Sequence, residues 1–399
     1  MLYRKMGKTG ESLSVLGYGC MRFPRKNGRI DEVRTEQQIV SAIEAGVNYF
    51  DTAYIYPGSE KVLGKILAKG YRDRVKLATK LPPYLVYSRK DMDKILETEL
   101  ARLCTNYIDF YLIHALPNYE SWERFKDLGG IDFIREAKEK GKIKYIGFSF
   151  HGNALNFKKI VDDYPWEFCM MQYNYLDENY QAGKVGLEYA ASKGLGVVIM
   201  EPLRGGMLVR KMPKEVQQMW DKSDIKRTPV EWALRWIWNH PQVTTILSGM
   251  NMEEHIQENI RIAGEAHPSS LTEDELTTVQ WAKEAFEKLT RVNCTACGYC
   301  MPCPAGVDIP SCFQFYNEKH MFGKSTMYLP TTSGMTGGKP AYASLCKECG
   351  KCEKHCPQNL PIRNLLKDVS KDMEGWMMKP VVGIARLYFK IRKGFNKPK

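Results

Sequence analysis

The sequence predicts an α/β chain: a (β/α)8 TIM barrel followed by a small, mainly helical domain at the C-terminus. Over roughly the first 265 residues, eight short apolar runs alternate with amphipathic helical patterns. Eight strand–helix units over about 250 residues are the number and the length typical of this barrel. Downstream of them, eight of the twelve cysteines fall into two short runs, which indicates a separate small domain.

The alternation begins at Val15 and sets the order of the predicted elements. The predicted strands are Val15–Gly19, Val47–Phe50, Val75–Thr79, Ile108–Ile113, Ile143–Phe148, Phe168–Gln172, Gly196–Met200 and Thr244–Leu247. Amphipathic patterns between them predict the helices Glu36–Ala45, Lys90–Leu103, Ile131–Glu139, Lys184–Ser192 and Pro229–Asn239. Strands alternating with helices in this way are typical of a parallel sheet.

A doubly wound open sheet is the alternative arrangement of such units. It would be expected to carry a Gly-x-Gly-x-x-Gly turn after its first strand. The residues there read Gly17-Tyr18-Gly19-Cys20-Met21-Arg22. The motif is absent, so the closed barrel is favoured.

Polar residues close six of the predicted strands. They are Asp51, Lys80, His114, Ser149, Gln172 and Glu201. In a TIM barrel the chemistry lies on the face where the strands end, so we expect these side chains to share one mouth. The segment after Asp51 brings Tyr56 to the same face.

A tyrosine, a lysine, an aspartate and a histidine in one pocket form a proton-donating arrangement. A free phenol has a pKa near 10. A neighbouring ammonium, held by a carboxylate, is expected to stabilise the phenolate and lower that pKa, so that the phenol can protonate a carbonyl oxygen as hydride arrives at the carbon. Each residue also has a purely structural explanation: Asp51 could cap a helix, Lys80 could be a solvated surface charge, and His114 could be a core histidine. Their shared position at strand ends favours the catalytic interpretation.

The first part of the chain resembles the aldo-keto reductases, over roughly residues 3 to 265. The residues that carry the resemblance are Gly46-Val47-Asn48-Tyr49-Phe50-Asp51-Thr52-Ala53, Tyr56, Leu77-Ala78-Thr79-Lys80, Tyr111-Leu112-Ile113-His114, Ile146-Gly147-Phe148-Ser149 and Gln172-Tyr173-Asn174. The whole chain is similar to the branch of this family that carries a C-terminal ferredoxin-like domain.

The resemblance implies an NAD(P)H-dependent enzyme that reduces an aldehyde or a ketone. It implies Tyr56 as the general acid and Lys80 with Asp51 as the pair that adjusts the pKa of its phenol. It implies His114 as the residue that orients the carbonyl oxygen. Cofactor contacts are implied for Ser149, Gln172, Glu201, Leu203, Ser248, His255, Glu258 and Asn259. Ser149 and Gln172 would hold the nicotinamide carboxamide.

The sequence departs from the family at several positions. Phe150 and His151 follow Ser149, where the family usually has Asn, and Met200-Glu201-Pro202-Leu203 stands where many members stack a tyrosine under the nicotinamide. In the adenosine segment, Gly249 and His255 replace the usual Lys and Arg. A 2′-phosphate loses two cationic partners there, which leaves the preference between NADH and NADPH open. Arg204 and Arg261 are the candidates to replace them.

The two cysteine runs predict iron–sulfur chemistry. They read Cys294-x-x-Cys297-x-x-Cys300-x-x-Cys303-Pro304 and Cys346-x-x-Cys349-x-x-Cys352-x-x-x-Cys356-Pro357. The second run has the spacing with which bacterial ferredoxins bind a 4Fe-4S cluster, and its last Cys serves the other cluster in two-cluster proteins. A pair of zinc ribbons is the alternative, but four cysteines in one run followed by Pro fit zinc poorly.

The crossed arrangement predicts two ligand sets and two 4Fe-4S clusters, or at least one. Cys294, Cys297, Cys300 and Cys356 would bind the first cluster, and Cys346, Cys349, Cys352 and Cys303 the second. The first run has only Met301 and Pro302 before its last Cys, where the ferredoxin pattern has three residues. Ligation by Cys303 is therefore the weakest part of the prediction.

Charge and composition limit the partners. The net charge is +12, and seven basic residues without an acid lie between Trp376 and Lys399. This tail reads as a basic amphipathic helix, and we favour packing against its own chain over contact with an acidic partner or an anionic membrane surface. No basic stripe with interleaved aromatics indicates nucleic-acid binding. Thiolate clusters and the lack of an apolar N-terminal run indicate the cytoplasm.

The expected organisation follows from these patterns. The expected segments are a barrel over 1–268, a connecting helix over 269–290, a ferredoxin-like 4Fe-4S domain over 291–372 and a basic amphipathic tail over 373–399. The connecting helix opens with a capping box, Thr272-x-x-Glu275. Two functions remain. The first is a reductase of small-molecule carbonyl compounds, whose clusters serve electron transfer, redox sensing or structure. The second is an electron-transfer protein that couples nicotinamide or the clusters to a redox protein partner.

Overall fold

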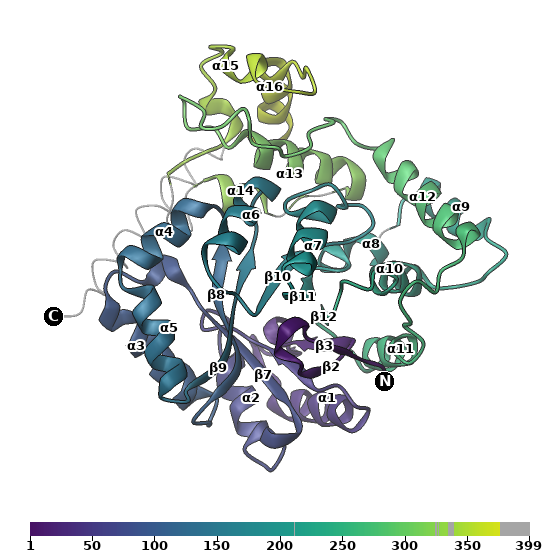
Figure 1. Ribbon diagram of the computed structural model, residues 1–399. Coiled ribbons are helices and arrows are strands. Elements are labelled where there is room, and N and C mark those ends of the chain that lie inside the picture. The colour runs from purple at the N-terminus through teal and green to yellow at the C-terminus, as the bar shows by residue number, and fades with distance from the viewer. Residues whose placement is uncertain (211, 324, 326, 334–338, 376–399) are drawn as a thin grey trace. The chain divides into compact units, whose positions relative to one another are not determined.

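The computed structural model describes residues 1–210, 212–323, 325, 327–333 and 339–375. Figure 1 shows the course of the chain. Its described residues divide into two compact units: residues 1–210 with 223–279, and residues 212–222 with the described residues between 280 and 375. The short segment 212–222, which contains α9 (Lys214–Asp221), thus groups with the second unit and not with the barrel that precedes it in sequence.

The first unit is built on a closed barrel of eight strands. The barrel strands are β3 (Leu16–Gly19), β6 (Tyr49–Asp51), β7 (Lys76–Leu81), β8 (Ile108–Leu116), β9 (Ile143–Phe150), β10 (Phe168–Gln172), β11 (Gly196–Met200) and β12 (Thr245–Ser248). Neighbouring strands pair in parallel in the order β10-β11-β12-β3-β6-β7-β8-β9. The predicted (β/α)8 barrel is confirmed, and its strand ends meet on one face.

Helices and two small hairpins complete the first unit. The helices are α1 (Glu32–Glu44), α2 (Ser59–Leu67), α3 (Arg89–Arg102), α4 (Tyr119–Asp127), α5 (Gly130–Glu139), α6 (Ala154–Asp163), α7 (Gly183–Ser192), α8 (Met207–Arg210), α10 (Pro229–Trp238) and α11 (Glu253–Ala263). The hairpins are β1 (Tyr3–Lys5) with β2 (Ser12–Ser14), and β4 (Arg25–Lys26) with β5 (Arg29–Ile30). Side-chain caps set several starts: Asp31 caps α1, and Ser88 with Asp91 forms a capping box on α3.

The barrel interior is filled by apolar and aromatic side chains. Phe110 lies edge-on to Phe168, with ring centroids 5.2 Å apart, and Tyr49 packs on Phe110 at 5.5 Å. Met6 and Leu13, from the β1–β2 hairpin region, belong to the same buried cluster. Such a packed interior leaves only the ends of the strands for chemistry.

Several strands run further than the sequence predicted, and β8 does so by the most residues. β8 continues to Leu116, with an irregularity in its pairing with β9 between Ile113 and Leu116, and β9 continues to Phe150. Ala115 there has a φ of 52°, in the left-handed region. An irregularity of this kind changes the direction of the side chains near the end of a strand. The spacing of apolar residues in the sequence does not predict it.

The second unit is small and mainly helical. Its elements are α9 (Lys214–Asp221), the later part of α12 (Glu273–Glu287), α13 (Ile309–Phe322), α14 (Tyr328–Thr332), α15 (Lys351–Lys354) and α16 (Ile362–Met373). A core that includes Val307, Phe313, Ile362 and Leu366 packs α13 against α16. The predicted capping box at the start of α12 is present: the Thr272 N–H donates to Glu275 at 2.7 Å.

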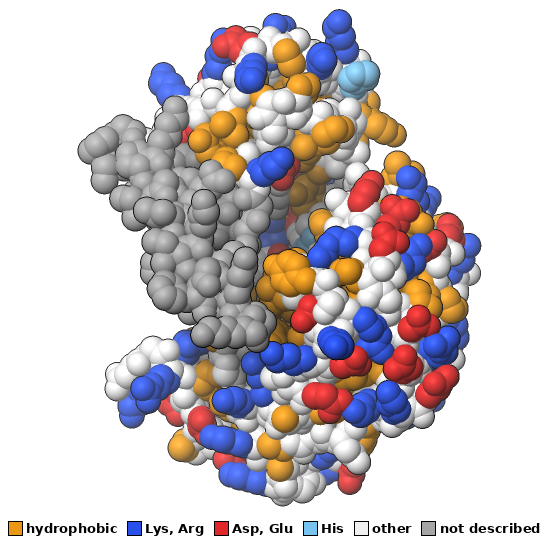
Figure 2. All heavy atoms as spheres, turned by 90° about the vertical axis from the view of Figure 1, so that its left-hand side faces the viewer, with side chains coloured by type: hydrophobic (Ala, Val, Ile, Leu, Met, Phe, Trp, Pro, Cys, Tyr) orange, Lys and Arg blue, Asp and Glu red, His pale blue; other side chains and the backbone are white. Residues whose placement is uncertain are grey.

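The basic tail predicted over 373–399 lies outside the described residues from 376 onward. Among the helices that the structure describes, none has the length and apolarity needed to cross a membrane. On the face of the barrel that Figure 2 shows, Lys and Arg side chains are interspersed with Asp and Glu side chains. The basic residues therefore form no continuous stripe on that face.

Candidate functional site

The four predicted catalytic residues come from adjacent strand ends. Asp51 is the last residue of β6, Lys80 lies near the end of β7, and His114 lies late in β8. These three strands are neighbours in the barrel. Tyr56 stands on the turn between β6 and α2, where its N–H donates to the Ala53 carbonyl at 3.0 Å. The barrel topology thus brings all four residues to one place.

Lys80 forms the buried centre of this group. Only 1 % of its surface is exposed, its Nζ donates to Asp51 Oδ1, and it donates to the Thr52 carbonyl at 2.7 Å. Burial alone would lower the pKa of Lys80, but the Asp51 carboxylate and the Tyr56 phenol raise it above its ordinary value. Lys80 is therefore an ammonium at neutral pH, paired with a carboxylate.

Tyr56 lies over this pair. The Lys80 Nζ is 5.0 Å from the centroid of the Tyr56 ring. Burial raises the pKa of Tyr56, and the opposing charge of Lys80 does not outweigh it. The expectation of a lowered phenol pKa is therefore wrong, because the loss of solvent around the half-buried phenol outweighs the charge of Lys80. A protonated phenol is what a proton donor requires.

His114 completes the group as a neutral imidazole. Its ring stands edge-on to the ring of Tyr56, with centroids 6.0 Å apart. Burial and the charge of Lys80 hold the pKa of His114 well below its usual value. Within the described chain, His114 Nδ1 is buried and has no hydrogen-bond partner. A neutral ring with an unused nitrogen can hold a substrate oxygen without competing for the Tyr56 proton.

The two residues expected at the nicotinamide lie at the ends of β9 and β10. Ser149 Oγ accepts the Ala115 N–H at 2.7 Å, which leaves its hydroxyl hydrogen free to donate. The Gln172 amide donates to Asp177 at 2.8 Å and accepts from Gln181 at 2.9 Å. One N–H and one lone pair of this amide remain. A hydroxyl and an oriented amide suit a carboxamide, so these residues fit the predicted cofactor.

Sequence reasoning missed the groups that orient Gln172. Asp177 also accepts from Asn174 at 2.9 Å and pairs with Arg204 at 3.0 Å. Asp177 and Gln181 follow the end of β10 within ten residues, so extending the strand-end search into the loop would have found them. Arg204, proposed as a partner for a 2′-phosphate, is instead buried with Asp177.

The expected adenosine residues spread over β12 and α11. Ser248 ends β12 and accepts from Asn259 at 2.9 Å, which joins the strand to the helix. Glu258 accepts from Thr228 at 2.7 Å. His255 is half-buried on α11.

The other predicted positions around this region differ in exposure and pairing. Glu201 is exposed just after β11, and Leu203 is half-buried. Arg261, the second cation proposed for a 2′-phosphate, pairs with Glu231 at 2.6 Å. Arg204 and Arg261, the two arginines proposed to bind a 2′-phosphate, therefore each form an ion pair with a carboxylate of the chain.

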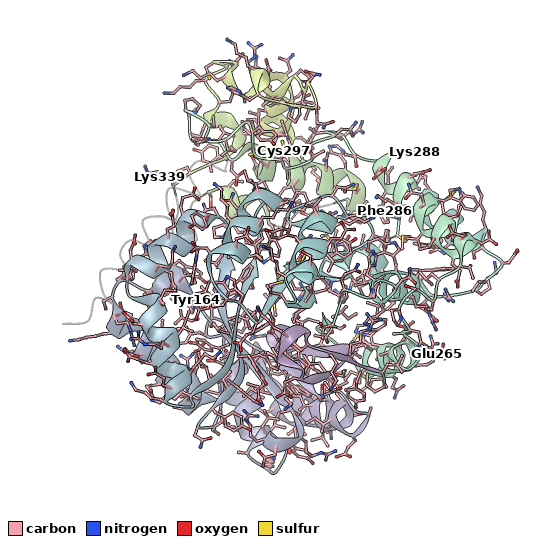
Figure 3. The ribbon with its side chains drawn as sticks, in the orientation of Figure 1. Tyr164, Glu265, Phe286, Lys288, Cys297 and Lys339 are labelled. Carbon is pink, nitrogen blue, oxygen red and sulfur yellow. The ribbon has the colours of Figure 1, made fainter. Side chains whose placement is uncertain are left out.

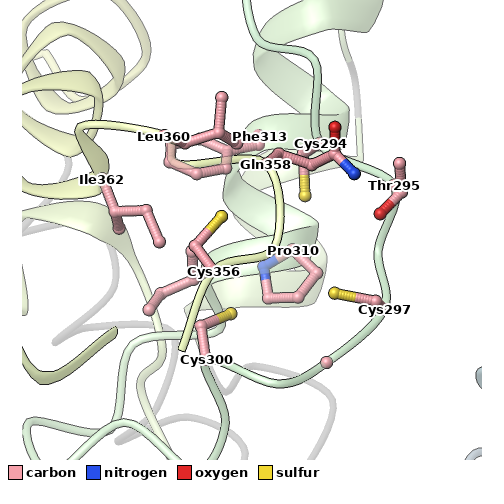
Figure 4. Close-up of a pocket in the computed structure, with 12 residues that line it drawn as sticks. Cys294, Thr295, Cys297, Cys300, Pro310, Phe313, Cys356, Gln358, Leu360 and Ile362 are labelled. Atoms are coloured by element: carbon pink, nitrogen blue, oxygen red, sulfur yellow. The ribbon is translucent and has the colours of Figure 1, made fainter. Parts of the chain in front are cut away.

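The second unit contains a pocket lined by four of the eight predicted cluster ligands. Their side chains point toward the same space in Figure 4, and they are Cys294, Cys297, Cys300 and Cys356. Pro310, Phe313, Leu360 and Ile362 supply apolar walls. Cys297 lies on the loop that leads into α13 (Figure 3). The pocket thus brings three cysteines of the first run together with the last Cys of the second run, the set that the crossed arrangement assigns to one cluster.

The two runs have the same local backbone. The second residue after each leading Cys, Ala296 or Glu348, has a φ of 53° or 55°, and its N–H donates to that Cys Sγ at 3.4 Å. The next Cys is followed by Gly298 or Gly350, with φ of 80° and 71°. Glycine suits this left-handed conformation. The repeated turn aims the thiols of both runs in the same way.

The ends of the runs also match, despite the missing residue before Cys303. The Gly306 N–H donates to the Cys303 carbonyl at 2.8 Å, and the Asn359 N–H to the Cys356 carbonyl at 3.1 Å. Burial raises the pKa of the Cys352 thiol, and the nearby Cys303 sulfur acts in the same direction. Cys303 and Cys352 both pack against the core of the second unit, while Cys349 is exposed.

These thiols do not converge on one ion. Within the described residues, no three His, Cys, Asp or Glu side chains stand close enough together to hold a single metal ion. Zinc requires such convergence, with ligands at about 2.0–2.3 Å. In a 4Fe-4S cluster each iron takes one thiolate, so four sulfurs surround a wider space. The pocket lined by Cys294, Cys297, Cys300 and Cys356 is compatible with such a cluster.

Comparisons with known proteins agree with both units. The model of the Aldo/keto reductase family matches residues 15–280, and the model of the 4Fe-4S dicluster domain matches residues 293–360. An L-galactose dehydrogenase of Arabidopsis thaliana is 26 % identical over 310 residues, which cover 72 % of this chain and 96 % of that protein. An L-glyceraldehyde 3-phosphate reductase of Escherichia coli K12 is 24 % identical over 65 % of this chain and 87 % of that protein.

A solved structure supports the same assignment. The holo form of an aldo-keto reductase from Bacillus halodurans is 27 % identical, has a TM-score of 0.59, and covers 71 % of this chain and 96 % of its own. The family match spans more than half of the chain, and the catalytic group lies within it. The chain therefore belongs to the aldo-keto reductase family and carries a 4Fe-4S dicluster domain after its barrel.

Proposed function

We propose that this oxidoreductase reduces the carbonyl group of a small aldehyde or ketone, with NADH or NADPH as hydride donor. The observation that carries the proposal is the group formed by half-buried Tyr56 and buried Lys80, Asp51 and His114 at the mouth of the barrel. A phenol, an ammonium held by a carboxylate, and a neutral imidazole are the groups that protonation of a carbonyl oxygen requires. Two relatives, named as a dehydrogenase and a reductase of small sugar-type compounds, are consistent with a small substrate.

Each residue has a defined role in this proposal. The neutral His114 ring holds and orients the carbonyl oxygen, and Tyr56 donates its phenolic proton to that oxygen as the carbon is reduced. Lys80, fixed by Asp51, stabilises the phenolate that forms. The Ser149 hydroxyl and the Gln172 amide hold the carboxamide of the nicotinamide, which when bound supplies the hydride.

The proposal also includes two 4Fe-4S clusters with the crossed ligand sets. Cys294, Cys297, Cys300 and Cys356 would bind one, and Cys303, Cys346, Cys349 and Cys352 the other. A hydride carries two electrons together, whereas a cluster accepts one electron. In this proposal the clusters therefore take no part in hydride transfer. They serve electron transfer, redox sensing or the stability of the domain.

The test is a substrate screen under anaerobic conditions. Protein with its clusters intact is mixed with NADH or NADPH and a panel of aldehydes and ketones, and nicotinamide oxidation is followed at 340 nm. The proposal expects oxidation that depends on the carbonyl compound. Oxidation that requires an artificial one-electron acceptor, and that no carbonyl compound supports, would favour the electron-transfer alternative.

A weak preference between the two nicotinamide cofactors is expected. Gly249 and His255 replace the cations that would pair with a 2′-phosphate, and Arg204 and Arg261 are held by carboxylates. The kcat/KM values for NADH and NADPH should therefore lie within about one order of magnitude. The variant His255→Arg should raise the preference for NADPH, while the surface control His267→Arg should not. A large preference for NADPH in the natural protein would contradict this.

A flat pH profile across the usual histidine range is also expected. Because burial and Lys80 lower the pKa of His114 far below 6.5, the ring stays neutral as the pH falls through that value. Activity should therefore not fall with an apparent pKa near 6.5, and kcat/KM measured across that range checks this. A fall near 6.5 that disappears in His114→Gln would show that the imidazole titrates normally.

A further inference from the structure

The second cysteine run lies in a basic segment of the chain. Lys347, Lys351 and Lys354 stand between or beside its cysteines, and all three are exposed. Lys351 and Lys354 are the first and last residues of α15, and residues three apart are neighbours on a helix surface. Cys349 is exposed among them. Each cysteine of the run thus has a lysine within two residues of it in the sequence.

Helix α16 adds a second row of cations. Arg363, Lys367 and Lys371 recur every four residues, so they lie along one face of the helix, and all three are exposed. Two ion pairs place this row beside the cysteine run: Arg363 pairs with Glu353 at 2.8 Å, and Lys367 pairs with Glu348 at 2.7 Å. The three lysines of the run and the three cations of α16 therefore form one surface, the basic face.

The acidic residues of α16 lie on another side of the helix. Burial raises the pKa of Tyr316 on α13, and Asp368 and Asp372 raise it further. Asp372 also pairs with Lys319 of α13 at 2.6 Å. Helix α16 thus separates its charges, with carboxylates toward α13 and cations toward the cysteine run.

The basic face keeps most of its charge. Among the described residues, Lys347, Lys351, Lys354 and Lys371 form no ion pair with a carboxylate. The side chains of the Lys367–Glu348 pair are 56 % and 54 % exposed, and ion pairs so exposed are weak. On the second unit as Figure 2 shows it, Lys and Arg side chains are more frequent than Asp and Glu side chains. Such a surface attracts an acidic partner.

We propose that the basic face binds a small acidic protein that carries one electron. This rests on the iron–sulfur part of the proposed function. A carrier must come close to the centre with which it exchanges an electron, and the basic face surrounds the exposed Cys349. Complementary charge raises the rate of such encounters and fixes their orientation. Each docked carrier gives up one electron to the second unit, and no proton is transferred and no bond is formed or broken.

The test uses the full chain, prepared anaerobically with its clusters, and an acidic two-cluster bacterial ferredoxin as the probe. Titration calorimetry measures the affinity for oxidised ferredoxin at about 0.01 M and about 0.15 M ionic strength, where exposed charges act over about 30 Å and about 8 Å. Stopped-flow absorbance measures how fast the protein reoxidises reduced ferredoxin. Affinity and rate should both fall as the ionic strength rises.

Two variants remove charge from different parts of the basic face. Lys347→Gln/Lys351→Gln/Lys354→Gln should weaken the dissociation constant and slow the reoxidation by about tenfold or more, because steering by charge contributes tenfold to a thousandfold. Lys371→Glu, near the end of α16 and well beyond the last cysteine, should act in the same direction. Iron content and the visible spectrum of each variant show that its clusters have assembled.

The matched control removes three lysines elsewhere. Lys5, Lys61 and Lys90 are exposed residues of the first unit, and none forms an ion pair among the residues that the structure describes. Lys5→Gln/Lys61→Gln/Lys90→Gln lowers the net charge by the same amount as the triple variant of the basic face. It should change neither the affinity nor the rate.

The outcomes separate this inference from the proposed function. Ferredoxin binding and reoxidation that are equal in the natural protein and both variants overturn the role of the basic face alone. If the triple variant loses its iron, Lys371→Glu decides, and unchanged binding in that variant overturns the proposal. Binding to phosphatidylglycerol vesicles that both variants lose, with no binding of ferredoxin, assigns the basic face to a membrane and overturns the protein partner. Natural protein without iron overturns both this inference and the iron–sulfur part of the proposed function.

Discussion

Replacing Tyr56 by Phe is expected to lower carbonyl reduction by about a hundredfold or more, the usual contribution of a general acid. The change removes one oxygen atom from a ring that lies 5.0 Å from Lys80 Nζ. His114 cannot substitute as the donor, because burial and Lys80 keep the pKa of His114 far below neutral. Single-turnover rates and cofactor affinity are to be measured together, and the affinity should be unchanged.

A neighbouring phenol provides the control for this variant. Tyr84, on the loop after β7, is half exposed, and Tyr84→Phe makes the same chemical change outside the proposed group. We expect normal turnover in Tyr84→Phe. Equal turnover in Tyr56→Phe and the natural protein would remove Tyr56 from the mechanism.

The second large effect concerns iron content. Anaerobically prepared protein is expected to contain about eight iron and eight sulfide atoms per chain, because eight cysteines fill two four-ligand sites. Cys356→Ala and Cys303→Ala should each reduce this to about four, whereas Cys104→Ala, at an exposed cysteine of the barrel, should not. Zinc in place of iron would overturn the assignment.

Double variants distinguish the crossed arrangement from an uncrossed one. In the crossed arrangement Cys294 and Cys356 serve the same cluster, so Cys294→Ala/Cys356→Ala should keep about four iron atoms. Cys294→Ala/Cys303→Ala would remove a ligand from each cluster and should leave almost none. The reverse pattern would show that each run binds its own cluster.

The sequence predicted those parts of the site that depend on strand order. Asp51, Lys80 and His114 each follow an apolar run, and parallel strands in a barrel necessarily bring such residues to one face. The spacing of the cysteines likewise predicted that Cys356 binds the same cluster as the first three cysteines of the first run, and Cys356 lines one pocket with them.

Other features depend on contacts between distant loops, and no local pattern reveals them. Arg22 and Gly205 are 183 residues apart in the chain, and the pairing of Asp177 with Arg204 joins the loops after β10 and β11. The direction of the Tyr56 pKa shift was predicted wrongly for a related reason. It depends on how deeply a loop is enclosed, which composition does not determine, and burial there outweighs the charge of Lys80.

The central claim is that a hydride passes directly to a carbonyl carbon held beside Tyr56. The most direct measurement is the reduction of a substrate, found in the screen, with nicotinamide carrying deuterium at C4 on the transferred face, in ordinary water. Direct transfer predicts one deuterium on the former carbonyl carbon of every product molecule, with the new hydroxyl hydrogen derived from water. Product without deuterium would show that the electrons travelled separately through the clusters, and would contradict the account.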